Sequence, residues 1–94
     1  TELVELRDRA YEGGVELKNA IVNKTGKNVY DYLQMHVHKM TQAAQHGRIN
    51  EFMDEVILFS NQFGLQIPRA LLEGMTDMRK FDVVSRSYII GVFS

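Results

Sequence analysis

Apolar residues recur at three- and four-residue steps over the first quarter of the chain, at Leu3, Leu6, Ala10, Gly14, Leu17 and Ile21. This spacing places them along one stripe of an amphipathic helix and predicts a helix from about Glu2 to Asn23. We expect the helix to stop at Thr25-Gly26, because glycine readily takes the left-handed conformation that closes a helix. Asn28 then suits the N-cap of the next helix.

The second predicted helix follows Asn28 and ends near His46 and Gly47. Its apolar face is made of Val29, Tyr32, Leu33, His36, Val37, Met40, Ala43 and Ala44. We expect Asn50 to cap a third helix, with acidic residues in the first turn, where the helix dipole favours them. The bulky face of that helix contains Phe52, Met53, Val56, Phe59 and Phe63. Gly64 is expected to end it.

The single proline marks a short fourth helix from Pro68 to Glu73, because proline in a first turn loses no internal hydrogen bond. A last helix from about Thr76 onward is apolar almost all round, which is typical of a buried segment or of one that packs on a partner. No strand pattern competes with these five segments. We therefore predict an all-α fold, a compact antiparallel four- to five-helix bundle that forms a single domain over residues 1–94.

Composition agrees with one folded domain, since 94 residues with 45% hydrophobic and 24% charged positions lie far from disordered chains. The absence of cysteine excludes disulfides and thiolate metal sites. No apolar run is long enough to span a membrane, and the start lacks the pattern of a signal peptide. We expect a cytoplasmic location without a membrane partner. The chain begins at Thr1 and ends in apolar sequence, which is compatible with a piece of a longer protein.

Charge is uneven along the chain although the net charge is only -1. Residues 18–48 carry a net charge of +4, whereas residues 1–17 and 49–73 each carry -3. If the first two helices are antiparallel, Lys18, Lys24 and Lys27 meet around their connecting loop. That loop is the best candidate for anion contact. Arg79 and Arg86 lie one heptad apart on the last helix, with Lys80 near its start, and favour a second anion site less strongly.

No catalytic or metal constellation emerges from the sequence. His36 and His38 are two residues apart on a helix, so they point to nearly opposite sides and do not share an ion. We interpret His36 as a hydrogen-bonded core histidine. Helix-one carboxylates at three- and four-residue spacing are interpreted as a solvated acidic face, at Glu5, Asp8, Glu12 and Glu16. No motif of a nucleotide loop, a nucleophile or a zinc hydrolase occurs. We therefore expect no enzymatic activity, no cofactor and no metal.

Several apolar residues lie away from the predicted core faces. Val4, Tyr11, Val15 and Val22 form a second stripe on the first helix, and Leu58 lies opposite the apolar face of the third. Such residues are typical of contacts with neighbouring subunits. We predict a protein interface at Val4, Tyr11, Val15 and Leu58.

Taken as a whole pattern, the chain resembles the C-terminal helical domain of the large subunit of type I CRISPR interference complexes (Cascade), a domain that also occurs as a separate small subunit. The opening matches at Leu6, Ala10, Gly14 and Leu17, the next helix at Lys27-Asn28-Val29-Tyr30, and the third at Gly47, Phe52 and Asp54. Pro68 precedes a short helix. The C-terminal part of the chain matches the family pattern at Phe81, Tyr88, Ile89 and Gly91.

The resemblance implies a small subunit of a crRNA-guided surveillance complex in antiviral defence, present in several copies. Its partners are then crRNA and target DNA within the complex, other Cascade subunits and further copies of itself. In that family guide pairing reads sequence, and helical subunits hold the backbone of the heteroduplex or the displaced strand without base readout. Charge alone assigns RNA- and DNA-binding first to Lys18, Lys24, Lys27, Lys39 and Arg48, and second to Arg79, Lys80 and Arg86.

Two other classes stay open. A helical protein-protein adaptor without a nucleic-acid role uses only the off-core apolar residues and shows no salt-dependent nucleic-acid binding. A small bundle enzyme requires an inward-facing carboxylate or histidine cluster, which the sequence does not offer.

Overall fold

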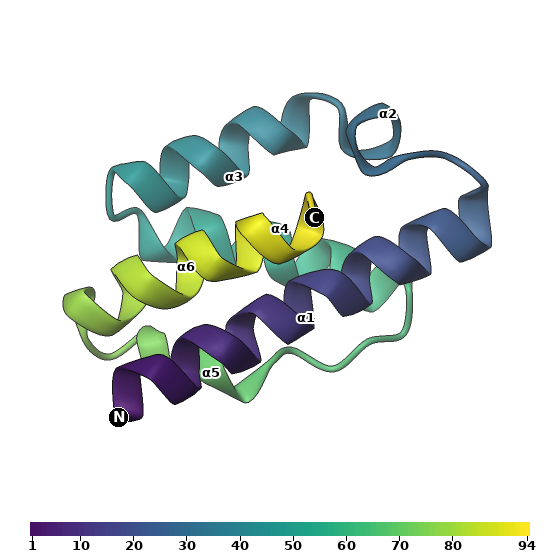
Figure 1. Cartoon of the computed structure of the whole chain (residues 1–94). Helices are drawn as coiled ribbons and strands as arrows, with labels where there is room; N and C mark the ends of the chain where they lie inside the picture. The colour runs from purple at the N-terminus through teal and green to yellow at the C-terminus, as the bar shows by residue number, and fades with distance from the viewer.

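The computed structural model describes residues 1–94, and all of their regular structure is helical. The six helices are α1 (Glu2–Thr25), α2 (Val29–Leu33), α3 (Met35–Gln45), α4 (Ile49–Gln62), α5 (Arg69–Gly74) and α6 (Met78–Val92). The predicted all-α helical bundle is confirmed, with one helix more than expected. Figure 1 shows α1 and α6 lying side by side, with α3 running back past α6 in the opposite direction.

The ends of α1 and the start of α2 follow from local chemistry, and the roles of Gly26 and Asn28 are as predicted. Thr1 accepts a hydrogen bond from the Val4 backbone nitrogen at its N-cap. Gly26 ends the helix with φ 72°, in the left-handed region where glycine carries no steric cost. Asn28 Oδ1 accepts from the Asp31 backbone nitrogen at 2.8 Å, which caps α2.

The second predicted helix is not continuous, because the chain breaks at Gln34. Gln34 has φ 50° and ψ -119°, and it separates α2 from α3. Neither glycine nor proline marks this position, so the helical period runs through it in the sequence. The break redirects the chain so that Leu33 before it and Met40 after it are both fully buried. Tertiary packing therefore overrides the local pattern.

Three other predicted boundaries were wrong by one or two residues. Asn50 lies inside α4, and Arg48 occupies the N-cap without a side-chain hydrogen bond. Pro68 occupies the N-cap of α5, which extends to Gly74. The last helix is capped by Asp77, whose carboxylate accepts from the Arg79 backbone nitrogen at 2.8 Å, and it therefore starts later than Thr76.

The centre of the bundle is the pair formed by α1 and α6, which run parallel and not antiparallel. Lys80 near the start of α6 reaches Glu2 at the start of α1, and Gly91 near its end meets Gly14. This common direction follows because α5 and its connections return the chain to the N-terminal end of α1 before α6 begins. The parallel pair departs from the antiparallel neighbours that we expected.

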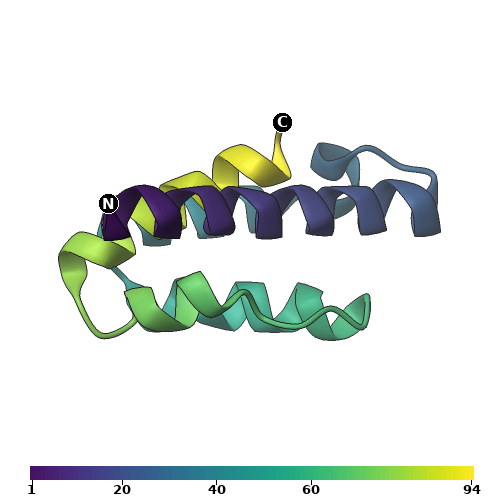
Figure 2. The ribbon, with the colours of Figure 1, turned by 60° about the horizontal axis from the view of Figure 1, so that its bottom comes forward.

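An aromatic cluster fills the space between α4 and α6. Phe52 of α4 stands edge-on to Phe81 and Tyr88 of α6, with ring centroids 5.5 and 6.1 Å apart. All three side chains are almost fully buried, and such edge-to-face pairs add to the free energy of burial. Figure 2 shows α4 and α5 along one side of the α1–α6 pair. On the opposite side of that pair, Figure 2 shows only the short α2, near the C-terminal end of α1.

Candidate functional site

The lysines around the α1–α2 loop do not form one open patch. Lys24 Nζ donates to the Phe63 carbonyl oxygen at 3.1 Å and lies 5.8 Å from the centroid of the Phe63 ring. It thus satisfies a carbonyl at the C-terminal end of α4, where a cation is favoured by the helix dipole. Lys27 is exposed in the loop, and its amine has no acceptor within the chain. Lys18 lies half-buried on α1.

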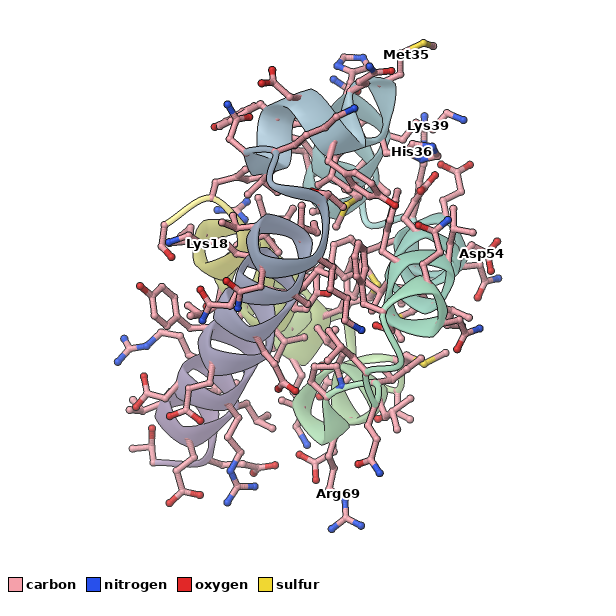
Figure 3. The ribbon with its side chains drawn as sticks, turned by 90° about the vertical axis from the view of Figure 1, so that its right-hand side faces the viewer. Lys18, Met35, His36, Lys39, Asp54 and Arg69 are labelled. Atoms are coloured by element: carbon pink, nitrogen blue, oxygen red, sulfur yellow. The ribbon has the colours of Figure 1, made fainter.

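Lys39 and Arg48 lie elsewhere, in a polar cleft between α3 and α4. The cleft is lined by His38, Lys39, Gln42, Arg48, Glu51, Asp54 and Glu55. Arg48 is 3.8 Å from Glu51, and three carboxylates outnumber the two permanent cations. Because these charges compensate one another, the cleft does not present a positive field to a polyanion. Figure 3 shows Lys39 and Lys18 on opposite sides of the bundle.

Two of the three cations predicted on the last helix are held by acids of the same chain. Lys80 Nζ contacts Glu2 Oε1 at 2.8 Å, and this hydrogen bond and charge raise the pKa of Lys80. Arg86 Nε contacts Asp82 Oδ1 at 3.1 Å, one turn away. Arg79 is exposed without an acidic partner. Among the eight predicted cations, those without a hydrogen bond or ion pair in the chain are therefore Lys18, Lys27, Lys39 and Arg79.

His36 is hydrogen-bonded, but it is not a core residue. Its Nδ1 lies 2.6 Å from Glu55 Oε2, and its ring stands edge-on to Phe59 at 4.9 Å. The side chain retains 36% of its exposure, because the break at Gln34 places it at the rim of the bundle. Figure 3 shows His36 close to Lys39 near the cleft between α3 and α4. No three His, Asp or Glu side chains are grouped so as to hold a metal ion.

The predicted interface residues fall on two separate surfaces. Val4 and Tyr11 are 41% and 40% exposed on α1, and Val15 is half-buried on the same face. Leu58 is 41% exposed on α4, beside exposed Ile57. In Figure 2, α4 and α1 run in different layers of the bundle.

Several exposed apolar side chains were missed from the sequence, among them Tyr30, Met35 and Ile90. Tyr30 stacks on Phe93 at 4.6 Å and still remains largely exposed. Met35 is 76% exposed immediately after the break, and Ile90 is exposed on α6 next to α1. Ile90 lies in a stretch that is apolar almost all round, so the sequence could not separate its exposed positions from its buried ones.

Comparison with known proteins finds no matching family model, no matching curated protein and no matching solved structure. None of the six helices is both long and apolar enough to cross a membrane. Functional assignment therefore rests on the cations without partners and on two exposed apolar surfaces.

Proposed function

We propose that the chain is a non-catalytic subunit of a cytoplasmic crRNA-guided type I CRISPR surveillance complex, in which it contacts nucleic-acid backbone and neighbouring subunits. The proposal is supported by the resemblance in sequence and by one structural observation. That observation is the exposed α1–α2 loop, where Lys27 has no internal partner. A free amine at a loop tip reaches a phosphate without first breaking a bond inside the protein.

This contact is sequence-blind and salt-dependent, because an amine recognises phosphate charge and not a base edge. Lys18 lies on α1 before the loop and is the second member of the proposed contact. With a net charge of -1, the chain alone binds nucleic acid weakly. Neighbouring subunits in the assembly then supply the rest of the affinity.

Fluorescence anisotropy with a labelled single-stranded oligonucleotide at low salt tests the proposal. We expect the double variant Lys18→Glu/Lys27→Glu to weaken binding at least about tenfold and to flatten its salt dependence. Arg9→Glu/Arg69→Glu is the matched control, since it makes the same change in net charge at two exposed arginines outside the predicted contact. A control that weakens binding equally, or a wild-type chain without salt-dependent binding, contradicts the assignment.

A second candidate function is a helical protein-protein adaptor without a nucleic-acid role. It is favoured by the observation that four of the eight predicted cations are already engaged within the chain, whereas Val4, Tyr11 and Leu58 remain exposed. Affinity purification from the native host separates the two functions. A particle that contains crRNA supports the first, and a stable partner protein without nucleic acid supports the second.

A further inference from the structure

One face of α1 carries a heptad pattern that the bundle itself does not use. Positions 4, 8, 11, 15, 18 and 22 alternate in steps of four and three residues, which is the spacing of coiled-coil contact positions. We call these six positions the outer α1 stripe; they are Val4, Asp8, Tyr11, Val15, Lys18 and Val22. The core face of α1 consists of other residues, which are Leu6, Ala10, Gly14, Leu17 and Ile21.

The outer α1 stripe is open to solvent on the side of the α1–α6 pair away from α4 and α5. Val4, Tyr11 and Val22 are each about two-fifths exposed, and Val15 and Lys18 are half-buried. Ile90 of the adjacent α6 is 61% exposed, in a groove that it shares with α3. In Figure 1, α1 and α6 lie side by side, with α4 passing behind them. A partner therefore meets a two-helix surface.

Two antiparallel copies of the stripe place compatible residues opposite one another. When two copies of α1 lie antiparallel about the level of Gly13, Val4 faces Val22, Tyr11 faces Val15, and Asp8 faces Lys18. We propose that a second copy of this chain packs on the outer α1 stripe in this antiparallel, two-fold arrangement. A two-fold contact uses the same patch on both partners, so one stripe suffices for both.

Charge selects the antiparallel direction. In a parallel pair Asp8 would face Asp8 and Lys18 would face Lys18, and both contacts are repulsive. In the antiparallel pair each Asp8 carboxylate meets the Lys18 amine of the other copy, so the dimer contains two attractive contacts. Lys18 has no acid within its own chain, and Asp8 has only an exposed contact of 3.4 Å with Arg7. Such an exposed ion pair contributes little to the stability of the fold, so Asp8 remains available to a partner.

The stripe is also rigid before a partner arrives. A helix of 24 residues is about 36 Å long, and the longest dimension of the bundle is 36 Å. α1 therefore runs the length of the molecule and is held by backbone contact with α6 at Gly14 and Gly91. Pairing then requires no ordering of a loop, which keeps its entropic cost low.

Sedimentation velocity of the full chain, without nucleic acid, tests this proposal. We expect reversible dimers with a Kd on the order of 100 µM, because the surface is small. Asp8→Lys and Lys18→Asp each place like charges opposite one another and are expected to weaken the dimer at least about tenfold. A 1:1 mixture of the two variants restores both attractive contacts in a heterodimer and is expected to sediment as dimer again. Lys27→Asp, off the stripe, is the control and leaves the dimer unchanged.

Three outcomes overturn the proposal. They are a chain that remains monomeric up to about 1 mM, charge variants that do not restore each other on mixing, and open head-to-tail oligomers. The circular dichroism of each variant establishes that it is folded. The inference goes beyond the proposed function and does not depend on nucleic-acid contact. Lys18 takes part in both proposed contacts, so Asp8→Lys, which keeps Lys18, is the variant that tests the dimer alone. If the chain dimerises but does not bind the oligonucleotide, the dimer through the outer α1 stripe is supported and the nucleic-acid role is rejected. If it binds the oligonucleotide but stays monomeric, the nucleic-acid role is supported and the dimer is rejected.

Discussion

Gly14 of α1 and Gly91 of α6 lie face to face where the two helices cross. A Cβ atom on Gly14 would fall on the Tyr88 carbonyl oxygen and 2.8 Å from the Val92 backbone nitrogen. A Cβ on Gly91 would meet α1 in the same way, 3.0 Å from the Val15 backbone nitrogen. The two backbones are therefore in direct contact, and neither position has room for a side chain.

We predict that Gly14→Ala destabilises the fold in spite of the higher helix propensity of alanine. Alanine in a helix gains about 1 kcal/mol over glycine, but the new methyl group meets backbone, which cannot rotate away. Overpacking of this kind typically costs 1–3 kcal/mol or more. At the upper end of that range, where a rigid backbone clash falls, the net loss is about 2 kcal/mol in the free energy of unfolding, measured from urea denaturation curves.

Glu12→Ala on the solvent face of α1 is the control for that experiment. This exposed position should change stability by no more than about 0.5 kcal/mol. If Gly14→Ala is as stable as the control, the two backbones are farther apart than described.

The sequence was sufficient to place Gly14 on the buried stripe of α1, because burial along a helix follows the local period. It did not indicate why that residue is glycine, since the reason lies in Gly91, which is 77 positions away in the chain. A contact between distant segments leaves no periodic trace in either one. The same limit explains why the parallel direction of α1 and α6 was not predicted.

Gln34 illustrates a second limit, because its conformation is imposed by the elements on either side. It is the only residue other than glycine with a positive φ. We predict that Gln34→Gly raises the free energy of unfolding by about 1 kcal/mol, since glycine adopts φ 50° and ψ -119° without steric cost. Gln42→Gly, inside α3, should instead lower it by about 1 kcal/mol. Thermal melts of both variants compare the two effects, and equal losses would contradict strain at Gln34.

The sequence identified the cations of the candidate site, but it did not show which of them are free and lie together on the surface. Charge along the sequence cannot distinguish Lys27, which is free, from Lys24, which bonds a carbonyl 39 residues away. It also cannot show that Lys80 and Arg86 already have acidic partners. The exposed apolar stripe on α1 was more visible, because both its exposure and its spacing follow from the geometry of one helix.

Replacing Lys24 and Lys27 one at a time distinguishes a cation that stabilises the fold from one that has no partner in the chain. We predict that Lys24→Ala lowers the free energy of unfolding by about 1 kcal/mol, because the Phe63 carbonyl loses a charged donor and its ring loses a cation. Lys27→Ala should change it by less than about 0.5 kcal/mol. Urea denaturation at low and high salt provides the comparison. Equal effects of the two substitutions would show that Lys24 is not held at the end of α4.

Tyr88 provides a test of the buried aromatic cluster through pH. Burial raises the pKa of Tyr88 well above its ordinary value of 10.0, and a hydrogen bond with Ser60 opposes the shift only in part. Because the unfolded chain loses this proton first, the contribution of Tyr88 to stability is complete below about pH 10 and is lost as pH rises above it. Tyr88→Phe has no such proton. We therefore expect wild type to lose stability relative to Tyr88→Phe between about pH 9 and pH 11, whereas exposed Tyr30→Phe should follow wild type. Urea midpoints across this range measure the difference, and curves for wild type and Tyr88→Phe that stay parallel would place the phenol in water.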